Sequence, residues 1–275
     1  MRTRHLAVPL LTVIGCGGAP AAQPAAPAPA AAGAFPTAGG KLVDLTHTFD
    51  EKTIYWPTSP SAFELKQLSF GKTPGGWFYA ANSVCTPEHG GTHLDSPIHF
   101  AEGKSTADQI PLSRLIAPAV VIDISEVAAA SPDALLEPAH IEAFEKQHGA
   151  IAAGTIVLIR TGWSSRWPDR KAYMGDDKPG DAGNLHFPGI SEAAARLLVE
   201  RSIAAVGIDT ASIDHGPSKN FIAHQVLNGA DIPAFENVAA LDQVPARGAV
   251  IIALPMKIGS GSGGPLRIVA WVPDR

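Results

Sequence analysis

Five short apolar runs alternate with polar stretches that contain glycine and proline. The runs cover residues 119–124, 155–160, 204–208, 249–254 and 266–272. Each is rich in β-branched residues, which is typical of a strand buried on both faces. A further strand-like run lies at residues 42–45. The pattern therefore predicts an α/β fold with a mixed sheet, whose strand order the sequence does not fix.

Two stretches have helical periodicity. Residues 138–147 place Ile141 and Phe144 on one side, and residues 192–201 follow Ser191, a favourable N-cap. Residues 166–189 have no period, so we expect a long loop there, of the kind that is often a functional lid or disordered. All of these elements fall within a single predicted domain, residues 41–275.

The N-terminus has the features of a targeting segment. Arg2 and Arg4 precede a mostly apolar run at residues 6–14, which is too short to span a bilayer. The run leads into Cys16 and resembles a bacterial lipobox, in which cleavage before the cysteine exposes it for lipid attachment. We therefore predict a lipoprotein signal peptide at residues 1–15. The lipid on Cys16 would anchor the protein to a membrane of the bacterial cell envelope, in an extracytoplasmic location. A plain secretory signal or a chance cysteine is the alternative.

Composition adds a tether and excludes one class of partner. Residues 16–40 are mostly Ala, Pro and Gly and carry no charge, as expected for a semi-stiff linker. The chain has 21 basic and 26 acidic residues and no basic stripe, which argues against a nucleic-acid partner. With Cys16 carrying lipid, only Cys85 remains, so no intramolecular disulfide is expected. We expect Cys85 to be a small buried residue.

Residues 89–100, HGGTHLDSPIHF, carry the clearest chemistry. His89 and His93 could share a helix face, but the glycines and the proline argue against a helix. In an extended chain His89, Gly91, His93 and Asp95 share one face, with Gly91 leaving room between the imidazoles. Two nitrogen ligands and one oxygen ligand suit Zn²⁺ or Mn²⁺ with open positions for water. A polar surface loop is the alternative.

This stretch resembles the His-x-Gly-Thr-His-x-Asp-x-Pro-x-His signature of the cyclase-like metal-dependent hydrolases. That family includes bacterial kynurenine formamidase and isatin hydrolase. Residues 44–47, 160–163 and 207–214 resemble its other blocks, so the likeness runs from about residue 44 to the C-terminal strand. The resemblance implies the cyclase-like swivelling β/β/α architecture. It also implies hydrolysis of an amide or formamide C–N bond by metal-activated water, as in an arylformamidase.

The resemblance also implies a second set of ligands. In the formamidase branch a bridging aspartate, a histidine and a glutamate hold a second ion, and His224 and Glu236 match those positions. One ion would then bind His89, His93 and Asp95, and the other Asp95, His224 and Glu236. Zn²⁺ is the favoured metal. Isatin-hydrolase-like members use one Mn²⁺ and lack the glutamate, so Glu236 favours the formamidase type.

Other residues receive roles by chemistry or by resemblance. His99 is the candidate acid/base that delivers a proton to the leaving nitrogen, with a further metal ligand as the alternative. Trp56 resembles an aromatic residue of the formamidase substrate pocket, although plain packing is equally consistent with a Trp before a Pro. Asp209 and Asp214 could orient ligands or cap a turn. The glycine-rich residues 259–264 precede a strand rather than a helix, so they do not form a nucleotide loop.

Three functions remain open from the sequence. The first is hydrolysis of a small-molecule amide or formamide, and the second is hydrolysis of an isatin-type cyclic amide on a single ion. The third is a non-catalytic lipoprotein that binds metal or a ligand at the cell surface, against which the proton-carrying His99 counts. Relatives in this family are commonly oligomeric, and the sequence neither supports nor excludes a homo-oligomer.

Overall fold

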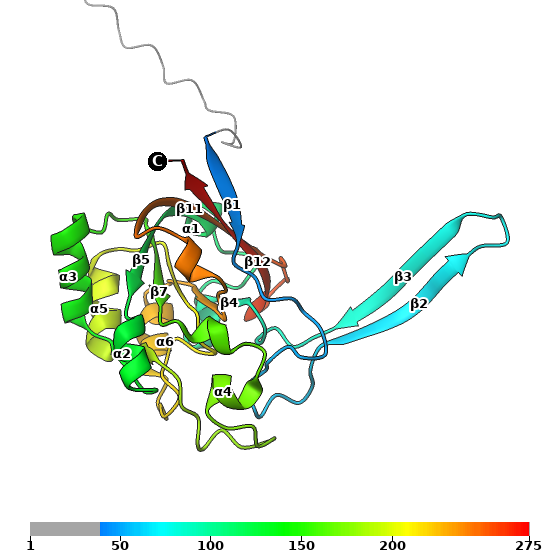
Figure 1. The fold of residues 1–275 in the computed structure, drawn as a ribbon, viewed down its shortest axis with the longest axis horizontal. Helices are drawn as coiled ribbons and strands as arrows, with labels where there is room; N and C mark the ends of the chain where they lie inside the picture. Colours follow the sequence, from blue (N-terminus) through cyan, green and yellow to red (C-terminus); the bar gives the residue numbers. More distant parts are fainter. Residues whose placement is uncertain (1–38, 275) are drawn as a thin grey trace, which may run out of the picture. The chain divides into compact units, whose positions relative to one another are not determined.

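Strands and short helices alternate through residues 39–274, the part of the chain that the computed structural model describes (Figure 1). The predicted signal peptide, Cys16 and nearly all of the predicted tether lie outside the described residues. The strands are β1 (Gly40–Asp44), β2 (Glu64–Lys72), β3 (Phe78–Cys85), β4 (His93–Asp95), β5 (Ile116–Asp123), β6 (Leu135–Leu136), β7 (Ile156–Arg160), β8 (Gly189–Ile190), β9 (Ala205–Ile208), β10 (Ala234–Glu236), β11 (Arg247–Pro255) and β12 (Gly263–Pro273). The α-helices are α1 (Leu112–Leu115), α2 (Ser125–Ala130), α3 (Pro138–His148), α4 (Arg170–Met174), α5 (Glu192–Glu200) and α6 (Ile222–Gly229), and the 3₁₀ turns are η1 (Pro97–His99), η2 (Trp163–Arg166) and η3 (Leu241–Gln243).

The main sheet is mixed, as predicted, and closes on itself. Its order is β1-β12-β11-β5-β7-β9-β10-β4, and a further pairing of β12 with β4 joins the two ends of a seven-strand barrel. β5, β7, β9 and β10 run parallel, whereas the other pairings are antiparallel. Closure requires β12 to bond three strands along its eleven residues: β4 at its start, β11 over most of its length and β1 at its end.

Two apolar cores flank the sheet. Alternate residues of the strands, such as Val121, Leu158 and Ile268, fill the barrel interior. Residues of the opposite parity on β5, β7 and β9 pack under α3, α5 and α6, as Ile122 and Val206 do. Burial on both faces is why these strands read as continuous apolar runs.

Most predicted elements are confirmed. The five apolar runs are β5, β7, β9, β11 and β12, and residues 42–45 fall largely in β1. Both predicted helices form, and the Ser191 side chain accepts a hydrogen bond from the backbone N–H of Ala194, as expected of an N-cap. The loop at residues 166–189 is irregular apart from α4. It is packed rather than loose, since Tyr173 and Phe187 are buried in a third apolar cluster.

β2 and β3 were not predicted. They form a separate two-stranded hairpin that extends away from the barrel in Figure 1. Cys85, at the end of this hairpin, is exposed, so the expectation of a buried cysteine was wrong. Within residues 39–274, no helix has the length and apolar character needed to cross a bilayer.

Candidate metal centre and active site

Strand pairing brings His93 and Glu236 face to face. β4 and β10 run antiparallel, and His93 is the register partner of Glu236. Residues that are opposite in an antiparallel pair have their Cβ atoms about 5 Å apart, so their side chains meet. The Nε2 atom of His93 lies 3.5 Å from Oε2 of Glu236 and 3.2 Å from Oδ1 of Asp95. All three side chains are buried.

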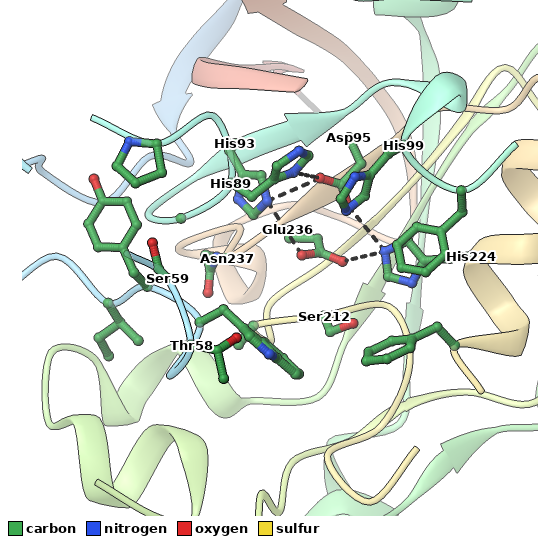
Figure 2. A pocket seen from close by; sticks show the side chains of 18 of the residues that line it. Thr58, Ser59, His89, His93, Asp95, His99, Ser212, His224, Glu236 and Asn237 are labelled. Atoms are coloured by element: carbon green, nitrogen blue, oxygen red, sulfur yellow. Dashed lines mark hydrogen bonds and ion pairs between the residues drawn. The ribbon is translucent and has the colours of Figure 1, made fainter. Parts of the chain in front are cut away.

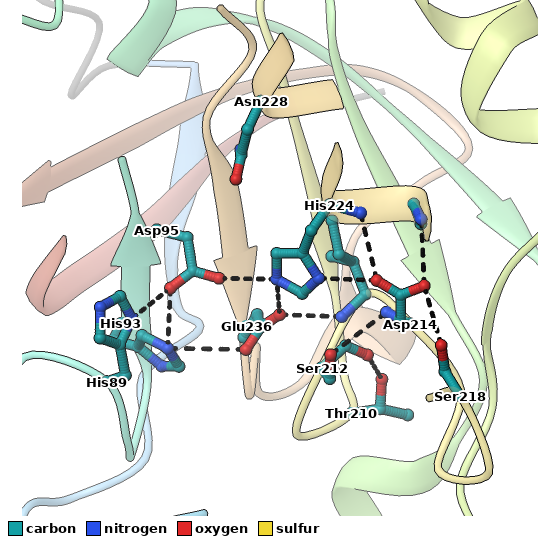
Figure 3. A network of polar contacts seen from close by, with 12 residues as sticks. His89, His93, Asp95, Thr210, Ser212, Asp214, Ser218, His224, Asn228 and Glu236 are labelled. Carbon is teal, nitrogen blue, oxygen red and sulfur yellow. Dashed lines mark hydrogen bonds and ion pairs between the residues drawn. The ribbon is translucent and has the colours of Figure 1, made fainter. Parts of the chain in front are cut away.

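His224, in the first turn of α6, brings its ring to the cluster formed by His93, Asp95 and Glu236. Asp214 accepts hydrogen bonds from the backbone N–H groups of Ala223 and His224, which caps the helix start. Asp214 also accepts from Nδ1 of His224 at 2.7 Å. The Nε2 atom of His224 then lies 3.1 Å from Oδ2 of Asp95 and 3.2 Å from Oε1 of Glu236 (Figure 3). Asp214 therefore orients His224, which was one of the two readings of this residue.

His89 joins the cluster by a different route from the predicted one. The chain before β4 is not extended, because Gly90 and Gly91 have φ values of +146° and +56°. This turn places Nδ1 of His89 2.6 Å from Oδ1 of Asp95. A Cβ on Gly91 would lie 2.6 Å from the Phe49 ring, so this glycine permits the turn and does not leave room between the imidazoles.

Gly91→Ala should destabilise the fold by about 2–4 kcal/mol, since a left-handed φ costs about 1–2 kcal/mol and the ring contact adds to that cost. Denaturant unfolding measures the change. Gly103→Ala is the matched control, because Gly103 has φ +76° and open space around its Cβ position. Equal losses in the two variants would contradict the assigned contact with Phe49.

In His89, His93 and His224, the ring nitrogen that points away from Asp95 is held by a hydrogen bond. Nδ1–H of His93 donates to the carbonyl of Gly91 at 3.0 Å, and Nδ1–H of His224 donates to Asp214. Nε2–H of His89 donates to Oγ of Ser262 at 2.9 Å. The other ring nitrogen of each histidine thus presents its lone pair toward Asp95, which is the arrangement of metal-ligating histidines.

Electrostatics favour a cation at this point. Burial alone would lower the pKa of His93, but the carboxylates of Asp95 and Glu236 outweigh it and raise that pKa to about 9. Burial also opposes the charge on His224, yet hydrogen bonds to three carboxylates raise its pKa well above the usual range. Burial and the charge of Asp95 raise the pKa of Glu236. The buried carboxylates thus draw positive charge into the cluster, which protons or a metal ion can supply.

The spacing of the donor atoms fits a metal ion. Two ligands about 2.1 Å from a tetrahedral ion are roughly 3.4 Å apart. The contacts of His93 and His224 with the two carboxylates are 3.1–3.5 Å. Asp95 directs Oδ1 to His89 and His93 and Oδ2 to His224, so the donors form two adjacent sets that share one carboxylate. All five predicted ligands lie together.

A cavity of about 380 Å³ opens onto these donors (Figure 2). The ring of His99, at the end of η1, stacks on that of His89 with centroids 3.8 Å apart. Desolvation, together with the neighbouring imidazoles, lowers the pKa of His99 to about 4 against the opposing charge of Asp95. The ligand atoms of His89, Asp95 and His99 lie within 4.8 Å of one another, so both readings of His99 remain open.

Polar side chains of Thr58, Ser59, Ser212 and Asn237 also line the cavity, and apolar side chains form most of the remaining wall. They are Ile54, Tyr55, Trp56, Pro60, Pro87, Phe100 and Phe221. The predicted pocket residue Trp56 contacts Phe221 and Phe187 edge to face, with centroids 6.0 and 6.3 Å apart. Phe187 and Trp163 are fully buried and do not line the cavity.

Asp209 has a structural role. Its buried carboxylate accepts hydrogen bonds from the backbone N–H groups of Thr161 and Gly162, at 2.8 and 2.9 Å. These contacts join the loops that follow β7 and β9. Burial raises the pKa of Asp209 to about 6 against those hydrogen bonds.

Sequence reasoning missed Glu88 and Ser262. Ser262 lies in the glycine-rich run before β12 and donates its hydroxyl to Glu88 at 2.5 Å while accepting from His89. Gly263 must lack a side chain, because a Cβ there would lie 2.7 Å from the His89 ring. The glycine-rich run therefore holds His89 in place. Its separation of more than 170 residues from Glu88 hides this role in the sequence.

Ser262→Ala should weaken metal binding about 10- to 100-fold, the usual effect of removing a group that orients a metal-ligating histidine. Competition with a chromophoric chelator measures the dissociation constant independently of turnover. Ser260→Ala, in the same run but exposed, is the matched control. An unchanged dissociation constant in Ser262→Ala would remove Ser262 from the metal centre.

Comparison with known proteins agrees with the geometry. The family described as "Putative cyclase" matches residues 43–215, which include His89, His93, Asp95 and His99. Isatin hydrolase from Roseibium aggregatum is 38% identical over 206 residues, covering 72% of this chain and 77% of the relative. Kynurenine formamidase from Polaromonas naphthalenivorans is 28% identical over 230 residues, covering 83% and 90%.

Solved structures give the same assignment. An isatin hydrolase bound to the product analogue thioisatinate superposes with a TM-score of 0.79 and 34% identity, covering 86% of this chain and 94% of that structure. A "novel cyclase" at 19% identity shares the fold with a TM-score of 0.68. The match over more than half of the chain, together with these relatives, means that the chain belongs to the cyclase family of metal-dependent hydrolases.

Proposed function

We propose that the protein hydrolyses the C–N bond of a small aromatic amide, with an N-aryl formamide as the leading substrate class. One observation carries the proposal. Asp95 offers one carboxylate oxygen to His89 and His93 and the other to His224, so two divalent ions can bind side by side and share it. Two ions in adjacent sites can stabilise both the attacking and the leaving groups of a displacement.

The chemistry divides between the bound ions and the protein side chains. A bound divalent ion lowers the pKa of water from about 16 to about 7 and polarises a carbonyl oxygen. His99 lines the cavity beside the ligand sets, where a ring nitrogen can accept a proton and return it to the leaving amine. Trp56, Phe100 and Phe221 surround the space beyond and favour a planar aromatic group.

A cyclic amide of the isatin type is the second candidate. It is favoured by the 38% identity to isatin hydrolase and by the TM-score of 0.79 to an isatin hydrolase structure. Ring opening would break the same kind of C–N bond, and the apolar cavity accommodates a fused aromatic ring equally well.

Metal content and turnover together test the proposal. Elemental analysis of the purified protein gives ions per chain, and hydrolysis of N-formylkynurenine and isatin is followed before and after chelation. About two ions with chelator-sensitive formamide hydrolysis support the leading reading. About one ion with isatin turnover supports the second candidate. Bound metal without turnover of either compound would favour the non-catalytic binding protein.

The favoured metal is Zn²⁺, with Mn²⁺ as the alternative. The donors are three imidazole nitrogens and two carboxylates, which suit either ion. Reconstitution of the metal-free protein with each ion, followed by turnover, distinguishes them.

We also propose that a lipid on Cys16 anchors the enzyme to a membrane of the cell envelope, outside the cytoplasm. The basic residues Arg2 and Arg4, the apolar run and Cys16 support this location. Cys16→Ser should move the protein from the membrane fraction to the soluble fraction and abolish labelling by a radioactive fatty acid. Retention on the membrane without the cysteine would contradict the anchor.

A further inference from the structure

Ser212 is a buried residue in the wall of the active-site cavity. It lies in the loop that follows β9, and only 3% of its surface is exposed. Its Oγ atom accepts a hydrogen bond from the backbone N–H of Asp214 at 3.2 Å (Figure 3). Among residues 39–274, no acceptor lies within hydrogen-bond distance for the hydrogen of this hydroxyl. A serine hydroxyl carries one donor besides its acceptor lone pairs, so the donor of Ser212 is available to a molecule in the cavity.

The other polar side chains of the wall differ from Ser212. Ser59 already donates its hydroxyl to a backbone carbonyl oxygen at 2.8 Å. The side-chain amide of Asn237 both donates and accepts hydrogen bonds within the protein, and Thr58 is exposed. A buried donor without a partner is costly, and such a group in a cavity wall calls for a hydrogen-bonding occupant.

The position of Ser212 is fixed by its neighbours in the loop. The hydroxyl of Thr210 donates to the carbonyl oxygen of Ser212 at 2.8 Å. The next residue, Ile213, donates its backbone N–H to Oε1 of Glu236 at 2.8 Å, which places the loop beside the ligand sets. A donor held in this way loses little conformational freedom when it binds a substrate, so it can select between similar molecules.

The cavity favours an uncharged acceptor for this donor. Of the described residues that line it, none is Lys or Arg, so a carboxylate of the substrate finds no cationic partner in the wall. The proposed reaction uses bound metal for the scissile carbonyl oxygen and His99 for the leaving nitrogen. In Figure 2, Ser212 and His99 lie on opposite sides of Glu236. The Ser212 hydroxyl is therefore left for a different oxygen of the substrate.

Both candidate substrate classes carry such an oxygen. In N-formylkynurenine and in isatin, the ring carbon ortho to the amide nitrogen bears an acyl group, whose carbonyl oxygen is not the scissile one. The aromatic side chains of Trp56, Phe100 and Phe221 favour a flat ring but contact its faces and edges through apolar atoms, so they do not distinguish one ring position from another. A single fixed donor at the side of the ring does.

We propose that Ser212 is a specificity-determining residue, whose hydroxyl donates a hydrogen bond to an acyl oxygen ortho to the amide nitrogen of the substrate. This inference rests on the proposed function, because it concerns the same cavity and the same aryl amides. The enzyme then selects ortho-acyl anilides, whether open formamides or fused lactams, over aryl amides with the acyl group elsewhere on the ring. Ser212 makes and breaks no covalent bond; it orients the substrate.

Binding of two isomeric amines tests the inference without turnover. 2-Aminoacetophenone and 4-aminoacetophenone resemble the amine product and differ only in the position of the acyl group. For the full chain loaded with metal, Ser212→Ala should weaken binding of the ortho isomer about 5- to 10-fold in titration calorimetry, the effect of one hydrogen bond, and leave the para isomer unchanged. Comparing the two proteins cancels any intrinsic difference between the isomers. Ser218→Ala is the matched control, because Ser218 also contacts Asp214 but does not line the cavity.

Turnover of the matching formamides gives a second measurement. Acyl groups at the ortho and para positions both withdraw electrons from the leaving nitrogen. For N-(2-acetylphenyl)formamide, Ser212→Ala should lower kcat/KM about 5- to 10-fold, whereas the para isomer should react as with the wild type. Equal losses for both isomers, with weaker metal binding in chelator competition, would mean that Ser212 acts through Asp214, and would overturn the inference. If Ser212→Ala misfolds, Ser212→Cys, which has a weak donor of similar size, takes its place.

The two measurements separate this inference from the proposed function. Turnover of both isomers with no ortho preference that depends on Ser212 overturns the role of Ser212 and leaves amide hydrolysis standing. Binding that is ortho-selective and depends on Ser212, without turnover of either formamide, supports the role of Ser212 and counts against the proposed reaction. Failure of both isomers to bind or to react would overturn both.

Discussion

Asp95→Ala should lower kcat at least about 10³-fold, which corresponds to about 4 kcal/mol of lost transition-state stabilisation. Asp95 contacts the imidazoles of all three candidate ligands, so its removal should disrupt both proposed ligand sets at once. The same variant should lose bound metal, because Glu236 alone cannot balance the charge of two divalent ions. Turnover and elemental analysis, run on one preparation, measure both effects.

Asp177→Ala provides the control for Asp95→Ala, since Asp177 is an exposed carboxylate in the loop after α4. It should retain full metal content and turnover. Near-wild-type kcat in Asp95→Ala would exclude the shared-carboxylate site, whichever substrate is used. Loss of one ion with partial activity would instead assign Asp95 to a single ligand set.

His99→Ala should lower kcat about 10²- to 10⁴-fold, the usual contribution of a positioned acid/base, while the metal content stays unchanged. The imidazole lies beside the ligand sets, stacked on His89, but is not held between the carboxylates. Turnover of an activated ester, whose leaving group needs no proton, should fall much less than turnover of an amide.

His148→Ala is the matched control for His99→Ala, because His148 is an exposed histidine at the end of α3. Loss of metal from His99→Ala, but not from His148→Ala, would move His99 into the ligand set. That outcome would leave the enzyme without the proton carrier assigned here.

The buried strands of the mixed sheet and the clustering of the candidate ligands are the parts that the sequence predicts well. Strands buried on both faces have a continuous apolar signal, and β5, β7 and β9 are of that kind. The candidate ligands are recognisable because a metal constrains residue type. His89, His93 and Asp95 were found by their spacing, even though the extended backbone assumed for them was wrong at Gly91.

The missed parts depend on contacts between distant residues. Ser262 meets His89 only because β12 and β4 pair across the closure of the barrel. The β2–β3 hairpin was missed for another reason: a bulge between Gln67 and Ser69 interrupts the alternation of Leu65 and Phe70, so no regular period marks the strand. In both cases the local sequence is compatible with several structures, and tertiary packing selects one.

Closure of the barrel by β12 has a consequence for biosynthesis. The last strand must pair with β1, more than 220 residues earlier, and with β4, about 170 residues earlier. Contacts of such high order form slowly and late. Because β12 pairs with β4, which carries His93 and Asp95, we expect the donors to reach their final positions only after residues 263–273 have been synthesised. A nascent or C-terminally shortened chain should then bind metal more weakly. Metal acquisition would then be a late step of maturation, one that depends on the pairing of the last strand.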